Sequence, residues 1–368
     1  MNVLVTGSAG FIGQNLIVHL KERADTEVLS FTRENSVDEL THDLQSTDFV
    51  FHLAGVNRPD NDDEFVKNNT EFTRSLCQIV KSLNRPVPIV FASSTQAEGE
   101  SPYGVSKRAA EEILMDLQAE TGSAVHIFRL PNVFGKWCKP HYNSVVATFC
   151  HNALNGLEHH IEDPLTTVDL VYIDDVVRVF LDVLEAPFST TTPTEVGPVH
   201  RCNLRDLALQ IDKFKTTEAS LITEPVGKGL IRALHATYLS YKSPGECVQN
   251  IEVHADRRGQ FAEILKTPAH GQFSYFTAGP GVSRGGHYHH TKSEKFLVVK
   301  GRAIFGFRHI ITKETLELEV SSDRPALVES IPGWAHSVTN VGDDEMIALL
   351  WSNEIFDHNN PDTFACQV

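Results

Sequence analysis

Two groups of residues have side-chain types and spacings that could perform chemistry. In the first, Tyr103 and Lys107 are four positions apart, which places a phenol and an ammonium on one face of a helix. A nearby cation favours the phenolate, so we expect Lys107 to lower the pKa of Tyr103 toward neutrality. Ser94, at the end of the preceding apolar run, can donate a hydrogen bond to a carbonyl oxygen. The three residues predict a site of carbonyl reduction.

The hydride for such a reduction is expected from a dinucleotide bound at a glycine-rich turn. The segment Gly7-Ser-Ala-Gly10-Phe-Ile-Gly13 follows a short apolar run and precedes a helical pattern. Its early glycines allow backbone amides to approach a pyrophosphate, and the last allows close packing of helix and strand. The residues expected to bind the dinucleotide here are Gly7, Gly10, Phe11, Ile12 and Gly13. A glycine-rich connection that binds no ligand is the alternative.

The end of the second apolar run indicates which dinucleotide binds. Its sequence, Leu29-Ser-Phe-Thr-Arg33, has no carboxylate for the adenosine ribose of NAD. A guanidinium at Arg33 suits the 2′-phosphate of NADP(H) instead. The sequence therefore favours NADPH, with Arg33, Tyr103 and Lys107 among the cofactor-binding residues. A solvated charge at the start of a helix is the alternative for Arg33.

The second group has the donor atoms of a metal site. His287 and His289 alternate on a predicted strand and therefore point to one face. Glu294 can fold back toward that face, and His336 arrives from a later strand. Three imidazoles and a carboxylate suit Zn, Fe, Mn or Ni, so the ligands alone do not choose the metal. A histidine-rich hairpin without metal is the alternative, and His290, outside the alternation, is expected at the surface or behind the ligands.

The elements that must position the first group follow from the periodicity of the apolar residues. Strands are predicted at Val3–Thr6, Val28–Phe31, Phe49–Leu53 and Pro88–Ala92, and helices at Phe11–Lys21, Asp63–Leu83 and Lys107–Thr121. Strand, crossover helix and strand in repetition are typical of a doubly wound parallel (Rossmann) sheet with helices on both faces. The first part of the chain is therefore predicted to have an α/β fold.

After about Val248 the apolar period changes to two, which predicts antiparallel strands in a sandwich or barrel. Alternation is visible in Phe296–Val299, in Ala303, Phe305 and Phe307, and in Leu316, Leu318 and Val320. The segment Ser240-Tyr-Lys-Ser-Pro-Gly245 is the predicted boundary, because Pro-Gly breaks regular structure where the period changes. The predicted domains are residues 1–243 and residues 247–368.

Composition limits the possible functions. The chain has 368 residues, 41% hydrophobic and 22% charged, and a formal net charge of −16. That length suits two globular domains, and that charge argues against a nucleic-acid partner. No apolar stretch approaches the roughly 18 residues of a membrane span, so no membrane partner is expected. The six cysteines are widely spaced, without a Cys-x-x-Cys pair, so we expect free thiols in the cytoplasm.

Residues 1–243 resemble the extended short-chain dehydrogenase/reductase family, many members of which act on nucleotide-linked sugars. Besides the motifs above, the resemblance rests on His52-Leu-Ala-Gly55, Arg129-Leu-Pro-Asn-Val-Phe-Gly135 and Val171-Tyr-Ile-Asp-Asp-Val176. It implies that Ser94, Tyr103 and Lys107 are a catalytic triad and that Lys107 also binds the nicotinamide ribose. It further implies that Asn132 meets the diphosphate of a nucleotide sugar, while the nearby Lys136 could add positive charge.

The second part resembles the cupin family. His287, His289, Glu294 and His336 match the two cupin motifs, which implies an all-β jelly-roll barrel around a metal. One departure is that Pro332 stands directly before Gly333 rather than two residues before it, which affects the expected turn. Upstream, the segment Asp256–Glu263 resembles that of deoxysugar 3,5-epimerases, which implies that Arg258 contacts a substrate phosphate; a charged β-turn is the alternative.

The combination resembles the bifunctional CapF-type capsular-polysaccharide enzymes over the whole length. Tyr238-Leu-Ser-Tyr241, Gly135-Lys-Trp-Cys-Lys-Pro140 and Asn360-Pro-Asp-Thr363 add to this resemblance. It implies zinc, NADPH and a UDP-linked 4-keto-deoxyamino sugar, UDP-2-acetamido-2,6-dideoxy-4-hexulose, epimerised at C3 in the cupin domain and then reduced at C4 on the route to UDP-N-acetyl-L-fucosamine. A homodimer is also expected. The sequence does not identify the residue that removes the C3 proton.

Three alternatives remain open on the sequence. The chain could be a monofunctional nucleotide-sugar 4-ketoreductase whose cupin domain only dimerises it. It could be a regulatory module that binds NADP(H) without turnover. It could also act on a different sugar, such as a dTDP-linked deoxyhexulose.

Overall fold

The computed structural model describes the chain except for residue 60, residues 186–192, residues 244–250 and residue 360. Its contacts divide the chain into two compact units. Unit 1 comprises Met1–Ile211 and Arg232–Lys242, and unit 2 comprises Asp212–Ile231 and Ser243–Val368. Part of the predicted boundary, together with Cys247, lies outside the described residues. The limits 1–243 and 247–368 therefore stay a prediction, and residues 212–231 group with the second unit rather than the first.

Unit 1 is built on a five-stranded parallel sheet. Its strands are β1 (Asn2–Thr6), β2 (Glu27–Phe31), β3 (Phe49–His52), β4 (Ile89–Ser94) and β5 (Val125–Leu130), in the order β2-β1-β3-β4-β5. The strand order changes direction between β1 and β3, and ligands of doubly wound sheets bind beyond the carboxyl ends of strands at such a point. The predicted glycine-rich turn follows β1 at this point.

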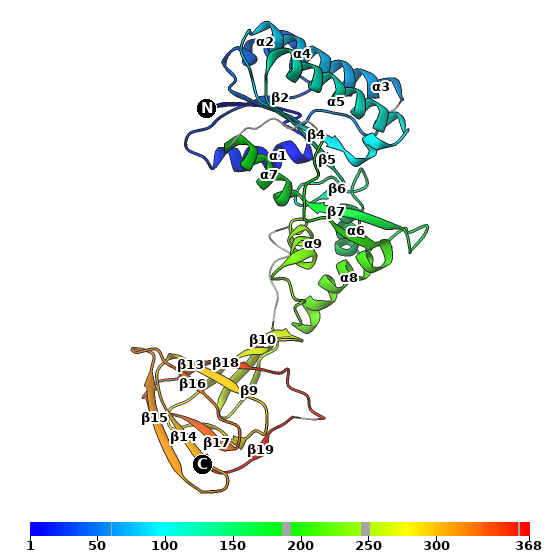
Figure 1. Cartoon of the computed structure of the whole chain (residues 1–368). Helices are drawn as coiled ribbons and strands as arrows, with labels where there is room; N and C mark the ends of the chain where they lie inside the picture. Colours follow the sequence, from blue (N-terminus) through cyan, green and yellow to red (C-terminus); the bar gives the residue numbers. More distant parts are fainter. Residues whose placement is uncertain (60, 186–192, 244–250, 360) are drawn as a thin grey trace. The chain divides into compact units, whose positions relative to one another are not determined.

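Helices cover both faces of this sheet, as predicted (Figure 1). One face has α2 (Val37–Ser46), α4 (Phe72–Ser82) and α5 (Pro102–Thr121), and the other has α1 (Phe11–Lys21) and α7 (Ile173–Glu185). Leucine, isoleucine, valine and phenylalanine side chains from the sheet and from α2, α4 and α5 form a core without solvent exposure at most positions. The helix predicted from Asp63 is interrupted, because α3 (Asp63–Phe65) continues into a π-helical segment, Val66–Glu71, before α4.

The first 242 residues contain further elements outside this sheet. They include a short 3₁₀ helix (Thr95–Glu98), β6 (Asn132–Phe134), α6 (Val145–Asn155), β7 (Thr167–Tyr172), β8 (His200–Asn203), α8 (Leu204–Ser220) and α9 (Gly229–Leu239). Strands β6, β7 and β8 form a second, three-stranded sheet. No helix in the described part of the chain is both long and apolar enough to cross a bilayer.

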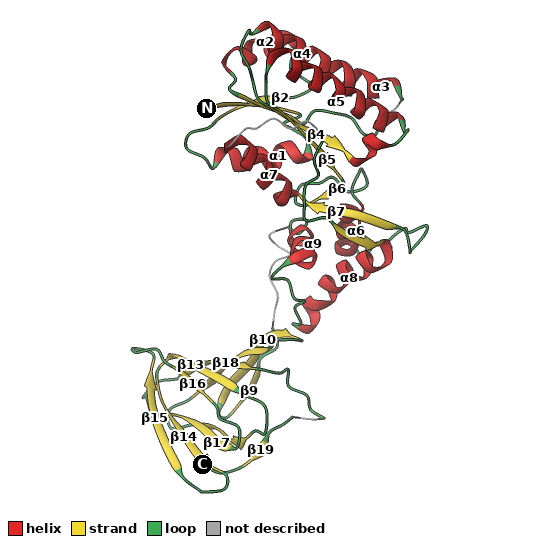
Figure 2. Cartoon of the chain, in the orientation of Figure 1, coloured by secondary structure: helices red, strands yellow, loops and turns green. Residues whose placement is uncertain are grey.

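From residue 251 onward the described chain consists of strands and loops (Figure 2). One antiparallel sheet has the order β16-β13-β18-β11-β10-β9 and the other the order β15-β14-β17-β12-β19. The strands are β9 (His254–Asp256), β10 (Gly259–Thr267), β11 (Gly271–Ala278), β12 (Ser283–Tyr288), β13 (Glu294–Lys300), β14 (Arg302–His309), β15 (Thr315–Ser321), β16 (Leu327–Glu329), β17 (Trp334–Asn340), β18 (Met346–Ser352) and β19 (Phe364–Ala365). The predicted fold class, a doubly wound parallel sheet followed by an antiparallel all-β domain, is confirmed.

The core of the all-β domain lies between its two sheets. Phe296 and Val298 from β13 pack with Phe305 from β14 and Val338 from β17. The apolar alternation of β15 has a different outcome, because the side chains of this edge strand are largely exposed, including Leu316. The period of two therefore predicted the strand itself but not which of its faces is buried.

Candidate active site and candidate metal centre

The glycine-rich turn packs tightly against the end of β3. Gly7 has a φ of +69°, and a Cβ there would lie 2.7 Å from the backbone nitrogen of Ala54. A Cβ on Gly13 would clash with the carbonyl oxygen of Gly7. Glycine at these two positions therefore lets the turn lie against the end of β3 and the start of α1 without strain or steric overlap.

Helix α1 begins directly after the turn and presents open backbone donors. Its N-cap, Gly10, has no side chain to accept the first N–H groups, among them those of Phe11 and Ile12. A helix N-terminus with unpaired N–H groups attracts a phosphate. These features fit the pyrophosphate of a dinucleotide. A cavity of about 470 Å³ adjoins the turn, lined by Ser8, Ala9, Gln14, Ile17, Val18, Ser30 and Trp137.

Arg33 is exposed in the loop between β2 and α2. No hydrogen bond or ion pair of its guanidinium is found within the described residues. The side chain is therefore available to an anion on this side of the sheet, and its role toward a 2′-phosphate stays a prediction.

The predicted catalytic residues lie on two adjacent elements. Ser94 is the last residue of β4, and Tyr103 and Lys107 lie in the first two turns of α5, which Ser101 caps. Burial raises the pKa of Tyr103, and a hydrogen bond with Ser94 opposes this effect. The structure thus brings Ser94 and Tyr103 together.

The predicted lowering of the pKa of Tyr103 by Lys107 is wrong for the protein alone. Lys107 is buried, and its Nζ donates to the carbonyl oxygen of Ala92 at 2.7 Å and lies 4.4 Å from the ring centroid of Phe91. Burial lowers the pKa of Lys107 to about 8, against an opposing effect of Glu111. Burial dominates both groups because each is removed from water, which disfavours phenolate and ammonium alike.

A partly buried ion pair lies next to Lys107 on the same helix and was not predicted. Glu111 lies one helical turn after Lys107 and is paired with Arg129, with Nη2 to Oε2 at 2.7 Å and Nε to Oε1 at 3.0 Å. Ser93, beside Ser94, donates to the same carboxylate. The sequence could have indicated Glu111, because it lies four residues after Lys107 and therefore on the same face of the helix as Lys107 and Tyr103.

A buried histidine lies beside this group. Both ring nitrogens of His52 are hydrogen-bonded: Nδ1 lies 2.8 Å from Thr6 Oγ1, and Nε2 lies 2.8 Å from Thr73 Oγ1. Burial, with a smaller effect of the Lys107 charge, lowers the pKa of His52 to about 3. The imidazole is therefore neutral, and it connects β1, β3 and α4 without adding charge near the ammonium.

The predicted substrate-binding residues already have partners within the protein. Asn132 donates to the carbonyl oxygen of Asp169 at 3.2 Å, and Lys136 forms an ion pair with Asp174 at 2.5 Å. Arg258 lies in the turn between β9 and β10 and is paired with Asp256 at 2.5 Å. The charged-turn alternative thus describes the local structure at Arg258, while binding of substrate by these three residues stays a prediction.

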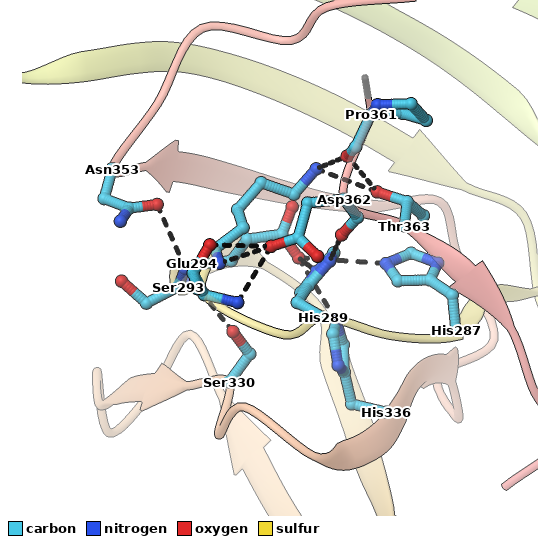
Figure 3. A network of polar contacts seen from close by, with 12 residues as sticks. His287, His289, Ser293, Glu294, Ser330, His336, Asn353, Pro361, Asp362 and Thr363 are labelled. Carbon is cyan, nitrogen blue, oxygen red and sulfur yellow. Dashed lines mark hydrogen bonds and ion pairs between the residues drawn. The ribbon is translucent and has the colours of Figure 1, made fainter. Parts of the chain in front are cut away.

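The four predicted metal ligands converge in the all-β domain (Figure 3). Donor atoms of His287, His289, Glu294 and His336 all lie within 4.8 Å of one another. Oε2 of Glu294 is 3.1 Å from Nε2 of His289, 3.1 Å from Nε2 of His336 and 3.9 Å from Nε2 of His287. Three imidazole nitrogens and one carboxylate aimed at a common point fit a divalent transition metal.

These four residues, which we call the cage, come from both sheets. His287 in β12 is paired with His336 in β17, whereas Glu294 begins β13 of the facing sheet. Burial raises the pKa of Glu294, but hydrogen bonds from the three imidazoles outweigh it and hold that pKa well below its ordinary value. The carboxylate is therefore ionised, the form that binds a metal. His290 is exposed, outside the cage.

Two further residues beside the cage were not predicted. The backbone carbonyl oxygen of Asp362 lies 2.6 Å from Nδ1 of His289. The carboxylate of Asp362 accepts hydrogen bonds from the backbone of the loop that follows His289. Lys292 is buried and donates to Pro361 and Thr363. The only hint in the sequence was the segment Asn360-Pro-Asp-Thr363, which added to the whole-chain resemblance but to which no function was assigned.

Comparison with known proteins identifies both halves of the chain. Residues 3–197 match the model of the NAD dependent epimerase/dehydratase family, and residues 254–364 match the polysaccharide biosynthesis C-terminal domain. A UDP-2-acetamido-2,6-beta-L-arabino-hexul-4-ose reductase from Pseudomonas aeruginosa is 50% identical over 368 residues, which cover 100% of this chain and 99% of that protein.

Solved structures agree with these matches. The capsular polysaccharide assembling protein CapF from Staphylococcus aureus aligns with a TM-score of 0.92 and 37% identity over 100% of both chains. A UDP-glucuronic acid 4-epimerase from Bacillus cereus aligns with a TM-score of 0.57 and 20% identity, covering 65% of this chain and 98% of that one, a likeness that shows the fold alone. The chain therefore belongs to the NAD dependent epimerase/dehydratase family and, through its second domain, to the two-domain branch that includes CapF.

Proposed function

We propose that this protein is a bifunctional nucleotide-sugar enzyme of capsular polysaccharide synthesis. Its all-β domain epimerises C3 of a UDP-2-acetamido-2,6-dideoxy-4-hexulose, and its first domain then reduces the C4 ketone with NADPH, on the route to UDP-N-acetyl-L-fucosamine. The observation that supports two activities in one chain is the closed His₃Glu cage in a chain that also has Ser94 hydrogen-bonded to Tyr103. The substrate follows from the full-length likeness to a reductase of that kind.

In the reductase half, bound NADPH supplies the hydride that adds to C4. Ser94 and Tyr103 contact the carbonyl oxygen, and Tyr103 gives that oxygen its phenolic proton as the alcohol forms. Its raised pKa keeps the phenol protonated near neutral pH, which suits a proton donor. Lys107 holds the nicotinamide ribose and places a positive charge beside the phenolate that remains. The products are the C4 alcohol and NADP⁺.

In the epimerase half, the cage holds a divalent metal, with zinc as the proposed ion. When bound, it would polarise a substrate carbonyl or hold the barrel together. His287, His289, Glu294 and His336 are the ligands, and Glu294 is ionised before any metal arrives. Arg258 is the proposed phosphate contact, for which it must exchange its pairing with Asp256.

Chemistry sets the order of the two reactions. The C3 proton is acidic only while C4 is a ketone, because the carbanion must delocalise into that carbonyl as an enolate. Reduction first would remove this acidity, so epimerisation precedes hydride transfer.

The deciding experiment incubates the full chain with the 4-ketosugar in deuterated water without NADPH. We expect deuterium at C3 of the recovered sugar, measured by mass spectrometry and NMR. His287→Ala should abolish this exchange and spare reduction of a ketone that is already epimerised. Recovery of unlabelled sugar from the metal-loaded protein would show that the chain is a monofunctional reductase. Loss of both reactions in His287→Ala would indicate that the cage is needed for folding.

A panel of nucleotide-linked 4-ketosugars tests the substrate and the cofactor together. We expect oxidation of NADPH, faster than that of NADH, with the UDP-linked acetamido sugar, and no turnover with dTDP-linked deoxyhexuloses. Arg33→Ala should narrow the preference for NADPH, because it removes the guanidinium proposed to meet the 2′-phosphate. Binding of NADPH without turnover of any ketone would instead favour a regulatory module.

A homodimer in the cytoplasm completes the proposal. Edge strands β15 and β16 expose Leu316 (53%), Leu318 (40%) and Leu327 (69%), apolar side chains at sheet edges that a second copy can cover. The five described cysteines are free thiols, which fits a reducing compartment. Light scattering should give a dimer for the wild type and a monomer for Leu316→Glu combined with Leu327→Glu.

A further inference from the structure

The loop between His289 and Glu294 is tied to one carboxylate from a distant part of the chain (Figure 3). Asp362 accepts the backbone N–H groups of His290 at 2.9 Å and of Thr291 and Lys292 at 2.8 Å each. The hydroxyl of Thr291 adds a fourth bond at 3.1 Å. This loop connects two of the four cage residues, so the carboxylate restrains the path between them.

A second tie runs in the opposite direction. Lys292 is 4% exposed, and its Nζ donates to Pro361 O and Thr363 Oγ1 at 2.8 Å each. We call these reciprocal bonds between residues 290–292 and residues 361–363 the clamp. Asp362 itself has a φ of +40°, a conformation that is rare for a residue other than glycine. The bonds of the clamp hold that conformation in place.

The clamp reaches the cage directly at His289. The backbone oxygen of Asp362 is 2.6 Å from Nδ1 of this ring, and a carbonyl oxygen only accepts, so Nδ1 bears a proton. Nε2, 3.1 Å from Oε2 of Glu294, is then the nitrogen of His289 that faces the cage, and it releases its proton when a metal binds. His336 differs, because its buried Nδ1 has no hydrogen-bond partner among the described residues. Of these two rings, His289 is therefore the one whose second nitrogen is held by a hydrogen bond within the described residues.

We propose that Asp362 is a positioning residue for the metal: through the clamp it fixes the ring orientation and the tautomer of His289 so that Nε2 completes the cage. The proposal rests on the metal site proposed above and goes further, because it makes the 361–363 segment part of that site. Metal binding and closure of the clamp must then stabilise each other. Outer hydrogen bonds to a ligand of this kind are typically worth 10-fold to 100-fold in metal affinity.

The test measures Zn²⁺ affinity of the full chain by competition with a chromophoric chelator. Asp362→Ala keeps the backbone oxygen that faces His289 but removes the carboxylate that binds the loop, so it is expected to weaken the affinity about 10-fold, the lower end of that range. Asp357→Ala is the matched control, because it removes an exposed carboxylate of the same region whose one hydrogen bond within the described residues is to the N–H of Asn359. The control should stay within about twofold of the wild type. Equal affinities of Asp362→Ala and the wild type would overturn the proposal.

A second variant tests the clamp in case Asp362→Ala does not fold. Asp362→Asn keeps one acceptor oxygen without the charge, so a loss of several-fold supports the clamp and wild-type affinity overturns it. Failure of the wild type to bind Zn²⁺ at all would refute the proposed metal site itself. Binding of Zn²⁺ by the wild type and by both Asp362 variants with equal affinity would refute only the role of the clamp.

Two spectroscopic measurements separate positioning from general stability. In the Zn²⁺-loaded wild type and in Asp357→Ala, the Nδ1 proton of His289 should give a slowly exchanging ring N–H resonance, which Asp362→Ala loses. Zn²⁺ should also slow hydrogen exchange of the backbone amides of Thr291 and Lys292 in the wild type. Amide exchange that ignores the metal would contradict the coupling.

Discussion

At the scale of single residues, burial controls the chemistry of the reductase site. Tyr103 and Lys107 are both removed from water, so the phenol is a weaker acid and the ammonium a stronger acid than in solution. The raised pKa of Tyr103 is an advantage, because a protonated phenol is the form needed to donate a proton to an alkoxide. Glu111 limits the shift of Lys107 and keeps the ammonium charged at neutral pH.

Replacing Tyr103 by phenylalanine tests the proton donor. We expect the rate of ketone reduction to fall about 10²-fold to 10⁴-fold, the usual contribution of a positioned acid, with little change in NADPH binding. Absorbance of NADPH gives the rate, and fluorescence titration gives the affinity. The exposed Tyr142→Phe is the control and should behave as the wild type. Full activity of Tyr103→Phe would remove this residue from the mechanism.

The lowered pKa of Lys107 predicts a basic limit to activity. As the pH rises through about 8, the ammonium loses its proton, so kcat/KM for reduction should decline above that pH. Glu111→Gln removes the charge that raises the pKa of Lys107, so the decline should move to lower pH. The measurement is a pH profile of kcat/KM for both proteins. If the pH profile of Glu111→Gln is the same as that of the wild type, the decline in kcat/KM does not come from deprotonation of Lys107.

At the scale of elements, the glycine-rich turn illustrates how backbone geometry makes a binding site. Gly7 and Gly122 have nearly the same positive φ, +69° and +71°. They differ in surroundings: a Cβ on Gly7 meets the end of β3, whereas one on Gly122 has nothing within 4 Å. The turn thus needs glycine for contact as well as for conformation.

This pair of glycines gives a matched test. Gly122→Ala should cost roughly 1–2 kcal/mol of unfolding free energy, the strain of a left-handed residue. Gly7→Ala should cost more and should also weaken NADPH binding, because the clash displaces the turn from β3. Thermal unfolding and NADPH titration measure the two effects. Equal losses of stability with unchanged NADPH affinity would show that contact at Gly7 is unimportant.

Much of the fold could be predicted because local patterns encode it. Buried parallel strands are continuous apolar runs in the sequence, and the spacing of the glycines predicts the turn after β1. The four cage residues could be predicted as a group for the same reason, since His287 and His289 are close in sequence. The clamp was not, because no spacing connects Asp362 with Lys292. Exposure of β15 and burial of Tyr103 also depend on tertiary packing, which is why the direction of one pKa shift was predicted incorrectly.

At the scale of the whole molecule, each compact unit contains one candidate site. Gly7, Ser94 and Tyr103 belong to unit 1, and the four cage residues belong to unit 2. A ligand that binds only the native state of one unit stabilises that unit by mass action, about 2.7 kcal/mol at 100 times its Kd.

Separate stabilisation can be measured by calorimetry. We expect NADPH to raise the temperature of one unfolding transition and a metal chelator to lower that of the other. The control is His287→Ala, in which the chelator should have no effect while NADPH still acts. A single transition that both reagents shift would indicate that the two units unfold together.

The place of Asp362 after all four cage residues in the chain has a consequence for biogenesis. A ribosome delivers His287, His289 and Glu294 first, His336 next and Asp362 afterwards, so every nascent chain passes through a stage with the donors made and the loop untied. The parallel sheet, whose strands precede all of these residues, can fold during that stage. With the proposed clamp, the cage therefore reaches its full affinity for a metal only after Asp362 has been made and has bound the loop.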